Sequence, residues 1–138
     1  MTFNRFNRSK ERYGNVKTKL PCPYGFSHRS QLELSVCHLI AQREKAGELK
    51  HLKHECHVSL SDAGIKSIPD FKCLDLKTGE EFYIEAKGFA NDRWPIVKKL
   101  WAAYGPGKLE VWQGTAARPK LTETIVPVLR VETMRRGT

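Results

Sequence analysis

Two short motifs near the middle of the chain carry the residue types that hydrolysis of a phosphodiester needs. Asp70 follows Pro69, and fifteen residues later comes the run Glu85-Ala86-Lys87. Carboxylate oxygens are the ligands that a hard cation such as Mg²⁺ prefers, and a bound cation can neutralise a phosphate and activate a water. A lysine beside it can stabilise the charge that develops in the transition state. These side chains therefore suit metal-assisted cutting of a nucleic acid, provided that the fold brings them together.

Two strand-like runs contain these motifs, at residues 68–76 and 81–87. The turn between them, residues 77–80, is short and contains a glycine. Such a pattern predicts a β-hairpin.

If the hairpin closes directly at the ends of both runs, Asp70 lies opposite Lys87, and Lys72 lies opposite Glu85. Opposed residues share one face of a sheet, as do alternate residues along a strand. All four side chains are therefore predicted on one face. Taken singly, Asp70 could be a surface acid near a turn, and Glu85 with Lys87 could be exposed strand charges. Together they favour a functional cluster.

The bulk composition predicts one globular domain with a polyanionic partner. The chain has 138 residues, 40% of them hydrophobic, with a net charge of +9 and a pI near 9.6. Such a positive balance favours nucleic acid. No apolar stretch reaches the roughly 18 residues that span a bilayer, and the N-terminus lacks an apolar signal region. We therefore expect no membrane partner and a cytoplasmic location.

The first twenty residues are predicted to form a flexible basic arm, followed by a single domain at 21–138. Aromatic residues (Phe3, Phe6 and Tyr13) are interleaved with its basic side chains, against one acid, Glu11. Such a composition suits contact with phosphates and stacking on bases. The arm residues assigned to DNA are Arg5, Arg8, Lys10 and Arg12. The alternative is a solubilising tail or a segment that packs on a second subunit.

An amphipathic helix is predicted from Ser27 or Ser30 to about residue 46, because apolar residues recur at three- and four-residue steps. The run Ser30-Gln-Leu-Glu33 matches a capping box, in which Ser caps the helix and Glu reaches back to it. Glu33 has a second interpretation as a third carboxylate directed toward the metal site. The spacing alone does not choose between them.

The other predicted elements are a strand at 49–60, a helix at 93–104, a strand at 108–113 and a short strand at 124–131. On the second helix, Lys98 and Lys99 extend a basic side. The element order predicts an α/β fold in which a helix precedes a three-strand meander, a second helix and a further strand.

The four cysteines have no CxxC spacing, and we expect them to be reduced and mostly buried in the core. The stretch 51–57 holds three histidines and a cysteine, which are zinc-ligand types. Strand alternation explains this stretch without a metal, with one face made of Leu52, His54, Cys56, Val58 and Leu60.

The Asp70 and Glu85-Ala86-Lys87 motifs, in this element order, resemble those of the PD-(D/E)XK nuclease superfamily, and Glu33 matches its early-helix carboxylate. More narrowly, residues 26–104 resemble small phage-encoded nucleases related to endonuclease I, which resolve branched DNA. The segments that carry this likeness are Phe26-Ser-His-Arg-Ser-Gln-Leu-Glu33, Ala46-Gly-Glu-Leu49, Ile68-Pro-Asp-Phe71, Glu85-Ala-Lys-Gly88 and Lys98-Lys-Leu100. The flanks carry no such match.

The resemblance implies a restriction-endonuclease-like core and a Mg²⁺-dependent endonuclease in which Mn²⁺ can substitute, with no nucleotide cofactor. Asp70, Glu85 and the backbone carbonyl of Ala86 would be the direct metal ligands. Glu33 would hold a second ion or act through a water. Lys87 would position the attacking water or stabilise the negative charge that grows on the phosphate.

Phosphate contacts outside the centre are assigned to Lys72, Lys98, Lys99 and the arm. Such contacts set affinity and not base sequence, and we find no sequence-reading helix. We therefore expect selectivity for branched DNA such as a Holliday junction, cut by a homodimer because two strands must be cleaved. The alternatives are another nuclease on the same scaffold (a transposon-end, nicking or restriction-type cutter) and a non-catalytic basic DNA-binding module.

Overall fold

The computed structural model describes residues 21–88 and 91–128. The predicted arm at 1–20, with Arg5, Arg8, Lys10 and Arg12, lies outside the described residues.

The chain forms a mixed five-stranded sheet in the order β1-β4-β5-β6-β7 and a separate two-stranded sheet, β2-β3. The elements are α2 (Gln31–Lys45), β1 (Leu49–His54), β2 (Val58–Ser59), β3 (Lys66–Ser67), β4 (Phe71–Asp75), β5 (Glu81–Ala86), α3 (Trp94–Tyr104), β6 (Leu109–Gly114) and β7 (Pro119–Ile125). β5 and β6 pair in parallel, since α3 supplies the long crossover that a parallel pair requires. The predicted α/β class and the β1-β4-β5 meander are confirmed.

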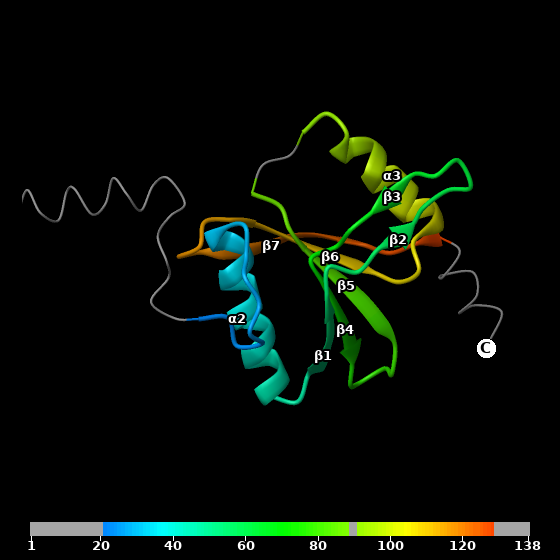
Figure 1. Ribbon diagram of the computed structural model, residues 1–138. Helices are drawn as coiled ribbons and strands as arrows, with labels where there is room; N and C mark the ends of the chain where they lie inside the picture. The colour runs from blue at the N-terminus through cyan, green and yellow to red at the C-terminus, as the bar shows by residue number, and fades with distance from the viewer. Residues whose placement is uncertain (1–20, 89–90, 129–138) are drawn as a thin grey trace, which may run out of the picture.

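Helices α2 and α3 pack on opposite faces of the large sheet (Figure 1). The alternation along β5 explains this, because Phe82 and Ile84 belong to the core under α2, whereas Tyr83 belongs to the core under α3. The α3 core is centred on Trp101, which is fully buried. Each helix thus covers one face, and β5 is buried from both sides.

The helix boundaries follow their predicted signals. Ser30 is the N-cap of α2, and its Oγ accepts a hydrogen bond from the Glu33 backbone N–H at 3.0 Å. Pro95 lies in the first turn of α3, where no backbone donor is needed. Neither helix within the described residues has the length and apolar character that crossing a bilayer requires.

The predicted strand at 49–60 is wrong in its second half, because β1 ends at His54. Glu55 has a positive φ of 54°, and its backbone N–H donates to the Asp70 carbonyl at 2.9 Å. Beyond this point the chain moves to the other face, where Val58 is buried in the core under α3. Leu52, predicted on the buried face, is 38% exposed, since a bulge interrupts the register of β1.

The predicted strand at 124–131 is also misplaced, because β7 spans Pro119–Ile125. The reason is a tight turn directly after β6. Gly114 has a φ of 96°, and the Arg118 N–H donates to the Thr115 carbonyl at 3.1 Å. Residues 129–131 lie outside the part of the chain that the structure describes.

The hairpin of β4 and β5 is present, but its predicted register is wrong by two residues. Lys72 lies opposite Tyr83 and not Glu85. Extending this register by one pair places Asp70 opposite Glu85 and not Lys87. A shift of two residues preserves which face each side chain occupies.

The cause of the shift is the chemistry of the turn. The Asp75 Oδ1 accepts hydrogen bonds from the N–H groups of Lys77 and Thr78, at 2.8 and 3.2 Å. Gly79 follows with a φ of 76°, which glycine adopts without strain. Asp75 therefore opens the loop one residue earlier than the apolar pattern predicted, and Leu76 is left 49% exposed.

Candidate active site

Asp70 and Glu85 form an interlocked pair of carboxylates where β4 begins and β5 ends. The Glu85 Oε1 accepts a hydrogen bond from the Asp70 backbone N–H at 3.2 Å. The Asp70 Oδ2 accepts one from the Ala86 backbone N–H at 2.8 Å. Each carboxylate is thus fixed by the opposite strand. The pairing that the sequence predicted on one face is present, although the register differs.

Both acids of this pair bind protons more tightly than free carboxylates do. Burial raises the pKa of Asp70 well above its ordinary value, and the negative charges of Glu85 and Glu33 raise it further. Burial also raises the pKa of Glu85, although the Lys87 ammonium partly offsets this. Two like charges this close are unfavourable without a cation or a proton between them. The pair is therefore suited to hold a divalent cation, which would remove the repulsion.

Lys87 completes this group. Its Nζ lies 3.2 Å from the Glu85 Oε2, and the two side chains are 22% and 14% exposed. The same ammonium lies 4.6 Å from the ring centroid of Trp94, the first residue of α3, where a cation–π contact is favourable. Lys87 is therefore held in place from both sides while keeping access to solvent.

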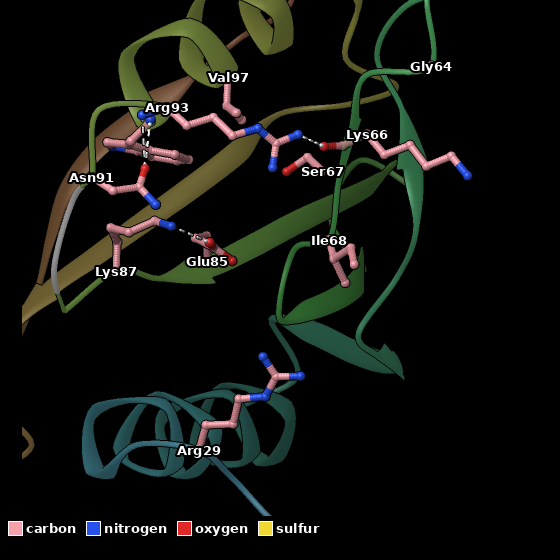
Figure 2. A pocket seen from close by; sticks show the side chains of 11 residues that line it. Arg29, Gly64, Lys66, Ser67, Ile68, Glu85, Lys87, Asn91, Arg93 and Val97 are labelled. Atoms are coloured by element: carbon pink, nitrogen blue, oxygen red, sulfur yellow. Dashed lines mark hydrogen bonds and ion pairs between the residues drawn. The ribbon is translucent and has the colours of Figure 1, made fainter.

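Glu85 and Lys87 line an open cavity of about 480 Å³ whose other charged side chains are basic (Figure 2). The remaining lining residues are Arg29, Gly64, Lys66, Ser67, Ile68, Asn91, Arg93, Trp94 and Val97. In Figure 2, Arg29 comes from the start of α2 on one side of the cavity, and Arg93 lies on the opposite side beside Asn91. The Arg93 Nη2 donates to the Lys66 carbonyl at 3.0 Å, which ties α3 to β3.

Three of these basic residues were not singled out from the sequence. Arg29 lies directly before Ser30, the N-cap of α2. Lys66 and Arg93 come from segments that only the folded chain brings together. The one local indication of a role for Arg29 in the sequence is its position directly before Ser30, within the segment 26–33.

The predicted phosphate-binding lysines do not line this cavity. The Lys72 Nζ pairs with the Glu81 Oε1 at 3.2 Å, and the Lys98 Nζ pairs with the Glu123 Oε1 at 2.9 Å. Lys99 is exposed on α3. They remain candidates for contact with a longer stretch of nucleic acid outside the cavity.

Glu33 is a buried acid whose carboxylate has a partner. Its Oε1 lies 2.8 Å from the Nδ1 of His28, and its charge acts on Asp70. Its backbone N–H is bound by the Ser30 cap. The cap is therefore made by the Ser30 side chain, whereas the Glu33 carboxylate contacts His28 and acts on Asp70 by its charge.

No family model matches the chain, and no curated protein is significantly similar. The site must therefore be interpreted from its own chemistry.

Proposed function

We propose that this protein is a Mg²⁺-dependent endonuclease that hydrolyses DNA phosphodiesters, with selectivity for branched DNA. The observation that carries the proposal is the interlocked Asp70–Glu85 pair with Lys87 beside it at the edge of a basic cavity. The mixed sheet with a helix on each face agrees with the restriction-endonuclease-like core that the PD-(D/E)XK resemblance implies.

Asp70 and Glu85 are the metal ligands in this proposal, together with the Ala86 carbonyl. Oxygen ligands of this kind suit Mg²⁺, and Mn²⁺ accepts the same set. Glu33 would take part through a second ion or a water. A bound ion would supply charge neutralisation at the scissile phosphate and activation of the attacking water.

Lys87 is assigned to the reacting phosphate. Its ammonium is fixed by Glu85 and by the face of Trp94, so it is preorganised to stabilise negative charge as that charge develops. A cation held by Glu85 would compete with Lys87 for this carboxylate, which would leave the Lys87 ammonium available to the phosphate.

The basic walls of the cavity support a polyanionic substrate. Arg29, Lys66 and Arg93 line the same cavity as Glu85 and Lys87, and arginine forks match phosphate geometry. These groups contact backbone and not base edges in the proposal, so selectivity would come from DNA shape. Because a four-way junction is two-fold symmetric, we include a homodimer in the proposal.

The test is cleavage of labelled four-way junction, nicked duplex and linear duplex of the same sequence, with and without Mg²⁺. Glu85→Gln and Lys87→Gln are compared with Asp62→Asn and Lys77→Gln, which change exposed residues outside the cavity. We expect Mg²⁺-dependent cutting of the junction that both site variants lose and both controls keep.

Other results would point elsewhere. If linear duplex is cut as fast as the junction, the protein is not selective for branched DNA, and another nuclease function on this scaffold is favoured. Binding of all three DNAs without cutting by any variant would instead indicate a non-catalytic DNA-binding module. Sedimentation of the junction complex would test whether two chains bind.

A further inference from the structure

A second group of potential ligands lies on the α2 side of the sheet, apart from the acidic pair. Ligand atoms of Cys22, His28, Cys37 and His54 all lie within 4.8 Å of one another. Cys37 is fully buried and His54 is 9% exposed, and the His28 side chain is 3% exposed. Two thiols and two imidazoles thus converge on one point in the interior of the fold.

The distances between these atoms match a tetrahedral zinc site. The two sulfur atoms lie 3.5 Å apart, the His28 Nε2 lies 3.1 Å from the Cys22 Sγ, and the His54 Nε2 lies 3.7 Å from the Cys37 Sγ. Zn–S bonds of about 2.3 Å and Zn–N bonds of about 2.0–2.1 Å place tetrahedral ligands roughly 3.4–3.8 Å apart. The separations of 3.5 and 3.7 Å lie within this range, the separation of 3.1 Å is shorter, and no pair of ligand atoms is more than 4.8 Å apart. Modest shifts of the side chains would therefore complete the geometry.

Each histidine also has the outer partner that metal-binding histidines require. The His28 Nδ1 lies 2.8 Å from the Glu33 Oε1, and the His54 Nδ1 lies 2.8 Å from the His51 Nε2. In both rings the Nε2 therefore faces the cluster while the Nδ1 is held from outside. Such contacts fix the tautomer and ring orientation of a zinc ligand.

Aromatic rings of the loop pack on the histidines at this site. Phe26 stacks on His54 with ring centroids 4.0 Å apart, and Tyr24 stacks on His51 at the same distance. Both aromatic residues lie between Cys22 and His28 in the chain. The loop thus supplies two ligands and the ring that stacks on a third, His54.

We propose that Cys22, His28, Cys37 and His54 bind one structural Zn²⁺. Two thiols would lose their protons on binding, so the ion and two thiolates would form a neutral centre suited to burial. Four protein ligands leave no open position, which is the mark of a structural and not a catalytic zinc. The ion would join the loop before α2, the helix itself and the end of β1. This proposal does not depend on nuclease activity.

The first test measures metal in the full-length wild-type protein, purified without chelators. We expect about one Zn²⁺ per chain by elemental analysis, retained on dialysis against excess Mg²⁺. Replacement by Co²⁺ should give the visible bands of a tetrahedral ion and a near-ultraviolet thiolate-to-cobalt band. Absence of zinc together with a Co²⁺ spectrum that lacks the thiolate band would overturn the proposal.

The second test uses matched variants. Cys22→Ser should abolish stoichiometric zinc, whereas Cys56→Ser, at a partly buried cysteine outside the cluster, should retain it. Glu33→Gln should weaken Zn²⁺ binding by about 10- to 100-fold, as loss of an outer-shell carboxylate does. Equal zinc content in Cys22→Ser and wild type would contradict the assignment.

A third measurement guards against variants that fail to fold. Two thiols 3.5 Å apart could also be joined as a disulfide if an oxidant removed their two hydrogens. In the wild-type protein, zinc should protect Cys22 and Cys37 from alkylation until a zinc-selective chelator is added. A mass deficit of two hydrogens on the Cys22–Cys37 peptides of freshly purified protein, with no bound metal, would show a disulfide in place of the zinc site.

Discussion

The Glu33 carboxylate lies 2.8 Å from the Nδ1 of His28, and its charge raises the pKa of Asp70. One side chain of α2 therefore links the Cys/His cluster on one side of the molecule to the acidic pair at the end of the hairpin. A change in the position of His28 would move the Glu33 carboxylate and so change the pKa of Asp70. The two groups are linked in this way although they lie in different segments of the chain.

Replacing Asp70 with Asn should separate stability from activity. The amide keeps an acceptor for the Ala86 N–H and removes one of two repelling charges. We expect the metal-free protein to gain about 0.5–2 kcal/mol of unfolding free energy, while DNA cutting is lost. Urea denaturation at pH 8 without metal measures the first effect. A loss of stability would show that the ionised carboxylate is needed by the fold.

The metal-free protein should lose stability as the pH rises. The folded-state pKa of Asp70 lies above the unfolded-state value, so its contribution is full below about pH 4 and is lost as the pH rises toward the folded-state pKa. Mg²⁺ requires the ionised pair, so its affinity should increase over the same range. Melting temperatures from pH 5 to 9, with and without Mg²⁺, test both trends. In Asp70→Asn the decline without metal should be smaller.

Lys87→Gln should reduce the cleavage rate by about 100- to 1,000-fold, the usual effect of losing one electrostatic stabiliser of the transition state. DNA affinity should change little, because the lysine is held by Glu85 and Trp94 in the free protein. Single-turnover rates and binding isotherms, measured beside Lys77→Gln, separate these effects. A rate like that of wild type would remove Lys87 from the mechanism.

Arg29→Ala and Arg93→Ala should each weaken DNA binding in a salt-dependent way. Both residues line the cavity that Glu85 and Lys87 also line. If each contacts one phosphate, the slope of log K against log salt should become shallower by about 0.9 for duplex DNA. Fluorescence anisotropy at several salt concentrations measures the slope. Lys77→Ala, on the distant hairpin turn, should leave it unchanged.

Ser30→Ala isolates the helix cap from the carboxylate. The Ser30 Oγ accepts from the Glu33 N–H, and losing a cap of this type costs about 0.5–2 kcal/mol. We expect a lower melting temperature with cutting retained. Glu33→Gln leaves the cap in place and should instead reduce cutting. If Glu33→Gln instead lowered the melting temperature and left cutting unchanged, Glu33 would serve the helix start alone.

The sequence predicted the shared face of Asp70 and Glu85 although it misplaced their register. The face that a side chain occupies depends only on the two-residue alternation of a strand. A register error of two residues therefore leaves the predicted face unchanged. Register depends on the turn, where the Asp75 side chain binds the N–H groups of Lys77 and Thr78. The pattern of apolar residues did not show that the Asp75 side chain would bind the backbone of the turn.

The Cys/His cluster was not predicted because its members are dispersed. The local run at 51–57 contributes His54 alone, and the other members come from the loop before α2 and from α2 itself. Cys37 has the position of an ordinary core residue on an apolar helix face. Only the packing of α2 against β1 shows that its sulfur faces His54.

Glu55 is the only non-glycine residue with a positive φ within residues 21–88 and 91–128. Leu49, before it, packs in the core under α2, whereas Val58 and Leu60, after it, pack in the core under α3. Its amide is bonded to the carbonyl of Asp70. The segment in which the chain passes from one face of the sheet to the other is therefore anchored to the backbone of Asp70, so the same hydrogen bond that holds this crossing also holds one member of the acidic pair.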